Sequence, residues 1–429
     1  MLAASPAFAA RSDPAPQGGD LEQRSLRPWH ADLVGTEGDD RAGGILALAD
    51  GGTVVALNVP APYEDVPHDG GVDAVLERRD ADGGVVWRHA VATAADDHVQ
   101  DIAPGPDGGV IITGYTTGNL DGEHPGVSTE DAFVAAVGAD GERLWTVQFG
   151  SRDAPDRMNA VVPDGEGRAY VAGYTEGVGL GGPGNQGNQD IYYARVDADG
   201  TGLTTTQTGG ESDEAALAMV PAPGGGVFMG GRTDGDVGFD GNHGGEDAWV
   251  SRVTYMFEDW VHQFGTAQDE RVTGLTTTAN GSVAAAGQTA GRLGERSAGD
   301  NDAFVRTLDP GSGDPRWTRQ LGTWSDDRGV DVLDRPDGSL TLVGSTEGWF
   351  GGLIGDVDVF VADLAGDGTP TAVTQTGSLA RDGVDERGVP NLDAAAGPNG
   401  SLVLGGLTYG APHGETNAGA GDVFVSSMR

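Results

Sequence analysis

Apolar residues fall in short runs along this chain, rich in Val, Ile, Thr and aromatic residues, and turns rich in Gly, Asp and Asn separate the runs. One such turn contains Asp107-Gly108, and Asp-Gly or Asn-Gly pairs of this kind join two antiparallel strands into a hairpin. The runs lack the 3.6-residue period of an amphipathic helix. The pattern therefore predicts an antiparallel, all-β protein.

Four runs form a unit that repeats seven times. The opening run carries Trp, or a substitute for it, at intervals of 55 to 59 residues, at Trp29, Trp87, Trp145, Thr204, Trp260, Trp317 and Ala372. The third run ends in Gly-x-Thr in six units, whereas the first unit has Leu57-Asn58-Val59 instead. After a longer loop, the fourth run begins with an Asp, at Asp73, Asp131, Asp190, Asp247, Asp302, Asp358 and Asp422.

Four antiparallel strands in about 57 residues are typical of one blade of a β-propeller, and seven units lie within the usual four to eight blades. We therefore predict a seven-bladed β-propeller over residues 29–429. The chain ends on an Asp-type strand at 422–428, with no Trp-type strand after it. We expect residues 29–34 to complete this last blade by pairing with the strand that contains Phe424, so that the ring closes without a free edge.

Several motifs carry a resemblance to a known family. They are the opening motif at 145–150, the Gly-Tyr-Thr at 173–175, the Asp-Ala-Phe-Val at 131–134 and the Asp-Ala-Asp-Gly turn at 197–200. Together they resemble the beta-propeller repeat family of the SBBP type, found in secreted and surface proteins of bacteria and archaea. The resemblance covers residues 29–429 and implies a propeller fold and export. It implies no single activity and supplies no catalytic residues.

The chain is strongly acidic. It has 66 acidic and 25 basic residues, a net charge of −41, and every base is Arg. This charge excludes nucleic acid as a partner. Concentrated salt shortens the range of charge repulsion to about 3 Å at 1 M, so the composition predicts a salt-adapted source. The alternative is an ordinary acidic secreted protein from a GC-rich genome, which would also favour Arg. The absence of Cys excludes disulfides and thiolate catalysis.

Residues 1–28 are expected to lie outside the propeller. The first ten residues are rich in Ala and resemble the end of a secretory signal, with Ala7 and Ala9 as the small residues of its cleavage site. Residues 11–28 read as a linker rich in Pro, Gln, Arg and Asp. The sequence contains no run of 18 apolar residues, so it predicts no membrane span. We expect a monomer that is secreted or held at the cell surface.

Two repeated acidic features invite a functional interpretation. Acid–Arg pairs are expected at the start of the innermost strand, at Asp40-Arg41, Asp156-Arg157, Glu270-Arg271, Asp327-Arg328 and Glu386-Arg387. They would ring the mouth of the central channel. Because residues copied into most blades usually serve the fold, we interpret them, and the Asp that begins each fourth run, as strand caps or ion pairs between blades.

Function is expected where the repeats disagree, on the face that carries the longer loops. The clearest disagreement is aromatic, at Trp324, Trp349 and Phe350, which we predict to lie on one face of one blade. Exposed aromatic residues serve as stacking platforms or interface anchors. The alternative is that they are buried under the extended loop at 378–391.

Metal binding has one weak candidate, because Asp234, Asp236 and Asp240 alternate with Gly as in calcium loops, but without the EF-hand spacing. We predict no other cofactor. His68, His124, His243 and His413 lie at unequal distances before their Asp, which argues against a shared zinc site.

Two functions fit these features. The first is a noncatalytic extracellular scaffold that binds a surface glycan or a protein. The second is an extracellular carbohydrate-active enzyme, a polysaccharide lyase or a glycoside hydrolase. The sequence shows no cluster of His, Arg, Tyr and acid that breaks the repeat, and this favours the scaffold.

Overall fold

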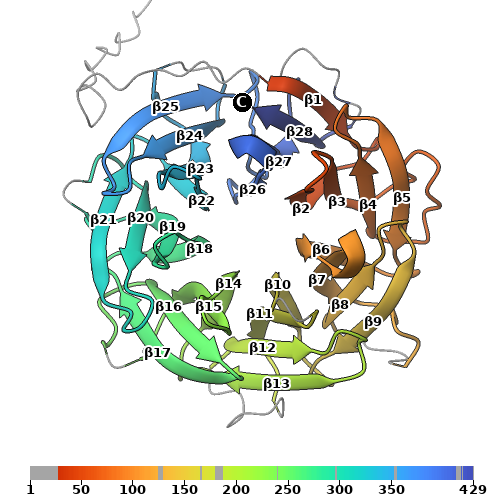
Figure 1. Cartoon of the computed structure of the whole chain (residues 1–429), viewed down its shortest axis with the longest axis horizontal. Coiled ribbons are helices and arrows are strands. Elements are labelled where there is room, and N and C mark those ends of the chain that lie inside the picture. Colours follow the sequence, from red (N-terminus) through yellow and green to blue (C-terminus); the bar gives the residue numbers. More distant parts are fainter. Residues whose placement is uncertain are drawn as a thin grey trace, which may run out of the picture.

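The computed structural model describes residues 28–123, 129–164, 167–178, 187–238, 240–294, 297–351, 355–411, 417 and 419–428. The predicted signal remnant and almost all of the linker therefore lie outside the described residues. Seven four-stranded antiparallel sheets form a ring around a central channel, as predicted (Figure 1). We number the blades in chain order, from blade 1 (β2–β5) to blade 7 (β26–β28 with β1).

Each blade runs from an innermost to an outermost strand. The innermost strands are β2 (Arg41–Ala47), β6 (Asp97–Pro104), β10 (Asp156–Pro163), β14 (Glu214–Pro221), β18 (Glu270–Thr277), β22 (Asp327–Asp334) and β26 (Leu392–Ala396). The second strands are β3 (Thr53–Val59), β7 (Val110–Thr116), β11 (Ala169–Thr175), β15 (Val227–Thr233), β19 (Val283–Thr289), β23 (Leu340–Thr346) and β27 (Leu402–Thr408).

The third strands begin with the repeated Asp: β4 (Asp73–Arg79), β8 (Asp131–Val137), β12 (Asp190–Val196), β16 (Asp247–Thr254), β20 (Asp302–Leu308), β24 (Asp358–Leu364) and β28 (Asp422–Met428). The outermost strands are β5 (Val85–Val91), β9 (Arg143–Phe149), β13 (Leu203–Thr208), β17 (Phe257–Phe264), β21 (Pro315–Leu321), β25 (Pro370–Thr376) and β1 (Pro28–Val34). Two three-residue 3-10 turns, Pro106–Gly108 and Pro398–Gly400, follow β6 and β26. Within the described ranges, no helix is long and apolar enough to cross a membrane.

The strand at the start of the propeller is the outermost strand of blade 7. β1 pairs antiparallel with β28, the strand that contains Phe424, as predicted, and Leu33 lies opposite Phe424 in this ladder. An ion pair between Asp32 of β1 and Arg79 also links the strand to the neighbouring blade 1. The first strand is thus held from two sides.

The repeated Trp and the repeated Asp-Gly turn belong to one contact between blades. The Nε1–H of Trp87 donates to the carbonyl of Ala139 in the turn of the next blade, at 3.0 Å. Gly141 in that turn has φ +87° and lies against the indole of Trp87, where a Cβ would come within 2.9 Å of the ring. Trp145 makes the same contact with Ala198 at 3.0 Å. The two motifs recur together because each needs the other.

The Gly of Gly-x-Thr is needed where the two inner strands of a blade come close together. A Cβ on Gly173 would lie 1.9 Å from the carbonyl oxygen of Arg157 on the innermost strand. Opposite this Gly, the third strand carries a large side chain, Tyr192 in this blade, which is fully buried. Burying one such side chain contributes about 1.5–3 kcal/mol, so these positions form the apolar core between blades.

An acid caps each blade, as the first residue of the innermost strand in blades 2 to 6 and ahead of that strand in blades 1 and 7. In blade 2, buried Asp97 accepts hydrogen bonds from the backbone N–H and the hydroxyl of Thr93, at 2.5 and 2.9 Å, and from the hydroxyl of Thr116. Thr116 is the Thr of Gly-x-Thr, so the cap joins the loop from the preceding outermost strand to the first two strands. The other caps are Asp40, Asp156, Glu214, Glu270, Asp327 and Asp382. The predicted structural role of these acids fits this geometry.

One of the predicted acid–Arg pairs was assigned to the wrong place. Glu386-Arg387 lies in the loop before β26, and the cap of blade 7 is Asp382, which holds Ser378 and Thr408. The loop from β25 to β26 carries extra residues between its cap and the strand, so the distance along the sequence misled the alignment.

The Asp that begins each third strand also serves the fold. Asp131 accepts a hydrogen bond from Nε2 of Gln148 at 2.9 Å, and Gln207 and Asp190 repeat this contact at 2.8 Å. The Gln belongs to the Gln-Phe-Gly motif that ends the outermost strand. The motif therefore links the third strand to the outermost strand of the same blade.

Candidate binding sites

Antiparallel connectivity places the tight turns of every blade on one face of the ring and the longer loops on the other. The longer loops connect the second strand to the third, and the outermost strand to the next blade. We call their side the long-loop face. Trp324 follows β21 and Trp349 follows β23, so both belong to this face.

Contacts between neighbouring loops bring the two Trp residues into one region. The backbone of Gly348 lies so close to Thr323 that a Cβ would come within 1.8 Å of the Thr hydroxyl oxygen. Each of these two residues immediately precedes one of the Trp residues in the sequence. Trp324 is 49% exposed and Trp349 is 52% exposed. Complete burial under the loop at 378–391, the alternative considered for them, is not observed.

Leu379 extends this region into the next blade. It follows Ser378, which holds the cap Asp382 as Thr323 holds Asp327, so Leu379 occupies the position of Trp324 one blade further on. The same position in the other blades carries Glu37, Ala94, Arg152, Glu211 and Ala267. Leu379 is 88% exposed, and Gly355 of the Trp349 loop lies against the Ser378 carbonyl. We call Trp324, Trp349 and Leu379 the apolar patch.

Phe350, the third predicted ligand residue, belongs to the core. It is buried against Phe360, with ring centroids 5.1 Å apart, and its N–H donates to Oε1 of Gln375 at 2.9 Å. In other blades, the backbone N–H groups of Leu120 and Leu293 donate in the same way to Oε1 of Gln148 and Gln320. The expectation that Phe350 is exposed with its neighbour is therefore wrong, because it fills a repeated apolar position.

A second cluster lies on the long-loop face at the opposite side of the channel mouth, where blades 2 and 3 meet. His98 stacks on Tyr115 with ring centroids 4.6 Å apart, and the guanidinium carbon of Arg157 lies 4.2 Å from the centre of the Tyr115 ring. Nε and Nη2 of Arg157 both donate to the carboxylate of Glu130. Tyr174 is the cross-strand neighbour of Arg157. We call these five residues the rim cluster.

The rim cluster corrects one inference from the sequence. A grouping of His, Arg, Tyr and acid that breaks the repeat was judged absent, and this judgement is wrong. The members come from two blades and from both sides of a long loop, so no spacing in the sequence groups them. One signal was present in the sequence, since the middle residue of Gly-x-Thr is Tyr in blades 2 and 3 only.

The aromatic and imidazole groups of the rim cluster are uncharged near neutral pH. Burial lowers the pKa of His98 and raises the pKa of Tyr115 and of Tyr174. No side-chain hydrogen bond joins these three residues to any other described residue, and all three are partly exposed. Their polar atoms can therefore bind solvent or a ligand.

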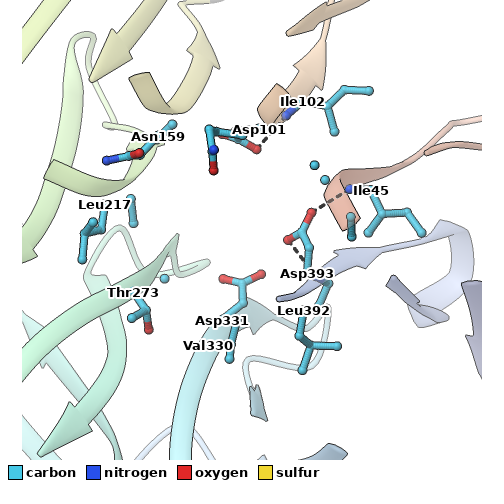
Figure 2. Close-up of a pocket in the computed structure, with 18 of the residues that line it drawn as sticks. Ile45, Asp101, Ile102, Asn159, Leu217, Thr273, Val330, Asp331, Leu392 and Asp393 are labelled. Carbon is cyan, nitrogen blue, oxygen red and sulfur yellow. Dashed lines mark hydrogen bonds between the residues drawn. The ribbon is translucent and has the colours of Figure 1, made fainter. Parts of the chain in front are cut away.

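The central channel encloses a cavity of about 400 Å³, lined by the innermost strands (Figure 2). Asp101, Asp331 and Asp393 occupy the same register on β6, β22 and β26, and their carboxyl groups line this cavity. Burial, followed by the charge of Asp393, raises the pKa of Asp101 to about 8. Burial raises the pKa of Asp393 to about 6 and that of Asp331 well above its usual range.

Two of these carboxylates join neighbouring blades. Asp101 accepts the N–H groups of Ile102 and, in the next blade, Val161, both at 2.7 Å. Asp393 accepts those of Ala394 and, in the next blade, Ile45. Asp331 binds the N–H of Val332 in its own strand. Asp101 and Asp393 therefore have a structural role in the packing of neighbouring blades.

The predicted calcium loop is occupied by protein contacts. Oδ1 of Asp236 accepts the N–H of Asn242, and Oδ2 of Asp240 lies 3.1 Å from Nδ1 of His262. The side chain of Asn242 donates to the carbonyl of Asp234. In the described part of the chain, no group of three His, Asp or Glu side chains could hold a metal ion. Calcium binding by this loop stays a prediction.

The predicted distribution of His residues is described in part. Nδ1 of His68 lies 3.0 Å from Asp73, and Nδ1 of His243 lies 3.1 Å from Asp247, so each imidazole lies beside the first residue of the third strand in its own blade. His124 and His413 lie outside the described residues.

Comparison with known proteins adds little beyond the fold. No family model matches the chain. Regulatory protein FlaEY of Caulobacter vibrioides is 25% identical over 289 residues, which are 58% of this chain and only 29% of the length of that relative. The family is therefore not shown, and the resemblance to SBBP-type repeats remains a prediction.

Solved structures align with most of this chain at low sequence identity and with TM-scores below 0.5. A polysaccharide lyase of family PL25, an ulvan lyase, has 10% identity and a TM-score of 0.49, with 92% of this chain and 95% of that chain covered. The quinohemoprotein alcohol dehydrogenase of Comamonas testosteroni has 11% identity and a TM-score of 0.46, with 94% and 76% covered. The GH93 α-L-arabinofuranosidase of Fusarium graminearum has 12% identity and a TM-score of 0.44, with 75% and 93% covered. Such similarity concerns architecture alone.

Proposed function

We propose that this protein is a noncatalytic extracellular scaffold that binds a glycan on its long-loop face. The observation that carries the proposal is the apolar patch, where two indoles about half exposed and Leu379 lie on adjoining loops. Among the Trp residues whose burial is described, Trp324 and Trp349 alone are exposed, whereas the others are buried or half-buried, so these two indoles need a reason. A flat indole can stack on the C–H face of a sugar ring while its N–H binds a hydroxyl group.

The scaffold supports this use because the loops of the patch are fixed from below. The caps Asp327 and Asp382 hold the first residues of the loops that carry Trp324 and Leu379. Phe350 anchors the loop of Trp349 in the core. A binding surface that is ordered before the ligand arrives loses less entropy on binding.

The test is a binding screen of the purified protein against soluble glycans in 2 M NaCl, followed by variants. Trp349→Ala should weaken binding by about 30-fold or more, the usual loss for an anchoring Trp. Its unfolding midpoint should match that of the original protein, because the indole is half exposed. Tyr255→Ala is the control, since Tyr255 is exposed in the β16–β17 turn on the opposite face. If no glycan binds, or if Trp349→Ala binds as well as the control, the proposal fails.

A carbohydrate-active enzyme is the second candidate, and the rim cluster is the observation that favours it. An uncharged imidazole beside phenols and a guanidinium is a grouping that could transfer protons. Incubation of each bound glycan with the protein separates the two candidates. Accumulation of shortened or unsaturated products would support an enzyme, whereas an unchanged polymer supports the scaffold.

A further inference from the structure

The rim cluster is ordered but its outward polar atoms have no partner among the described residues. Two contacts fix the ring of Tyr115, the stack with His98 and the guanidinium of Arg157. Glu130 in turn holds Arg157 with two hydrogen bonds, one of them at 2.6 Å. Rings held in this way present their hydroxyl and imidazole groups in fixed directions, as a preorganised site requires.

The charges around the channel mouth decide which ligand this cluster suits. The Arg residues on the long-loop side of the innermost strands are paired with acids. Arg157 pairs with Glu130, Arg271 with Glu246, Arg328 with Asp326, and Arg41 with Asp385. The positive charge at the mouth is thus neutralised, and the chain carries a net charge of −41. The net negative charge would repel a polyanionic ligand. A cation is disfavoured as well, because the carboxylates at the mouth already pair with the Arg residues.

We infer that His98, Tyr115 and Tyr174 form a second subsite for the same glycan, and that this glycan is an uncharged polysaccharide. The inference rests on the proposed function. Phenol and neutral imidazole groups each donate and accept hydrogen bonds, as sugar hydroxyls do. The rim cluster lies between blades 2 and 3 and the apolar patch between blades 5 and 7, on opposite sides of the channel (Figure 1). A ligand that occupies both subsites crosses the channel mouth, so it must be an extended chain of several sugars.

The variants that test this subsite remove polar atoms and keep the rings. Tyr115→Phe and Tyr174→Phe each remove one hydroxyl, and His98→Phe keeps the stack on Tyr115 without the imidazole nitrogens. Tyr255→Phe on the opposite face is the matched control. Binding is measured by isothermal titration in 2 M NaCl with soluble xylan, mannan and β-glucan as neutral polymers, and with alginate and polygalacturonate as anionic ones.

We expect a neutral polymer to bind and both anionic polymers to bind more weakly. Each rim variant should weaken binding of the long neutral polymer by about three- to tenfold, the effect of one lost hydrogen bond. A disaccharide of the same sugar is too short to reach both subsites, so its affinity should change in Trp349→Ala or in the rim variants, but not in both.

The outcomes separate the two proposals. If Trp349→Ala abolishes binding while the rim variants bind like Tyr255→Phe, the apolar patch stands and the second subsite is refuted. Preferential binding of alginate or polygalacturonate refutes the uncharged ligand class. If neither set of variants affects binding, or no polymer binds, the proposed function fails as well.

Discussion

The cap of blade 2 allows a quantitative test of how the repeat is stabilised. Asp97→Ala removes a buried carboxylate that accepts three hydrogen bonds, two from Thr93 and one from Thr116. At about 1 kcal/mol each, their loss destabilises the fold by roughly 3 kcal/mol, and the Thr93 N–H is left unpaired in addition. One effect acts against this. Burial raises the pKa of Asp97, so the fold disfavours the ionised carboxylate. Removing this carboxylate therefore offsets part of the stability that the lost hydrogen bonds provided.

We therefore expect Asp97→Ala to lower the free energy of unfolding by about 2 kcal/mol near neutral pH. Asp97→Asn should cost less than about 1 kcal/mol, because its oxygen still accepts from Thr93 and its amide can donate to Thr116. The assay is equilibrium urea unfolding in 2 M NaCl, followed by Trp fluorescence. Asp153→Ala is the control, since it removes the same charge from an exposed loop residue. If the free energies of unfolding of Asp97→Ala and Asp153→Ala agree within about 0.5 kcal/mol, the caps do not stabilise the blades.

Three further predictions concern the whole ring. The thermal unfolding midpoint should rise between 0.1 and 2 M NaCl because salt screens the net charge of −41, and an unchanged midpoint would contradict a salt-adapted design. Stability should fall as pH rises from about 4 to 8, because Asp393, Glu214 and Asp101 keep their protons in the fold up to pKa values of about 6, 7 and 8 and lose them earlier when unfolded. In thermal scans, Asp101→Asn should reduce the fall of the unfolding midpoint at the higher pH values of this range. The same dependence of the midpoint on pH in both proteins would refute this role of Asp101. Deletion of residues 1–34 should expose the edge of β28 and cause aggregation measurable by light scattering, whereas deletion of 1–27 should not.

The sequence predicted the blades well because their signals are local. Asp-Gly turns, the Gly-x-Thr ending and the Asp that starts the third strand each lie within one hairpin, so spacing alone places them. The pairing of residues 29–34 with the strand that contains Phe424 also followed, because a count of strands left one vacancy. Errors arose where a loop changed length, as at Glu386-Arg387, and where a repeated apolar position held an unusual residue, as at Phe350.

Contacts between blades were beyond the reach of the sequence. The indole of Trp87 lies over Gly141 of the next blade, and the repeat shows that both residues recur without showing that they touch. The rim cluster depends on the same geometry, because Arg157 of blade 3 reaches Tyr115 and Glu130 of blade 2. Such groupings depend on how two sheets pack, and packing is set by side chains far apart in the chain.

The repeat itself indicates which positions are free to carry function. In blades 2 to 6 the capping acid, its Ser or Thr partners, the Gly opposite the large core residue and the Gln–Asp pair are committed to the fold. Three kinds of position remain, each beside a committed residue: the one after the residue that binds the cap, the one after the capping acid, and the middle of Gly-x-Thr. The first kind holds Trp324 and Leu379, and the second holds His98 and Arg157. The third holds Tyr115 and Tyr174. Because each committed neighbour fixes its backbone, a substitution at these positions changes the surface and leaves the blade intact, so binding specificity and stability can vary independently in this chain.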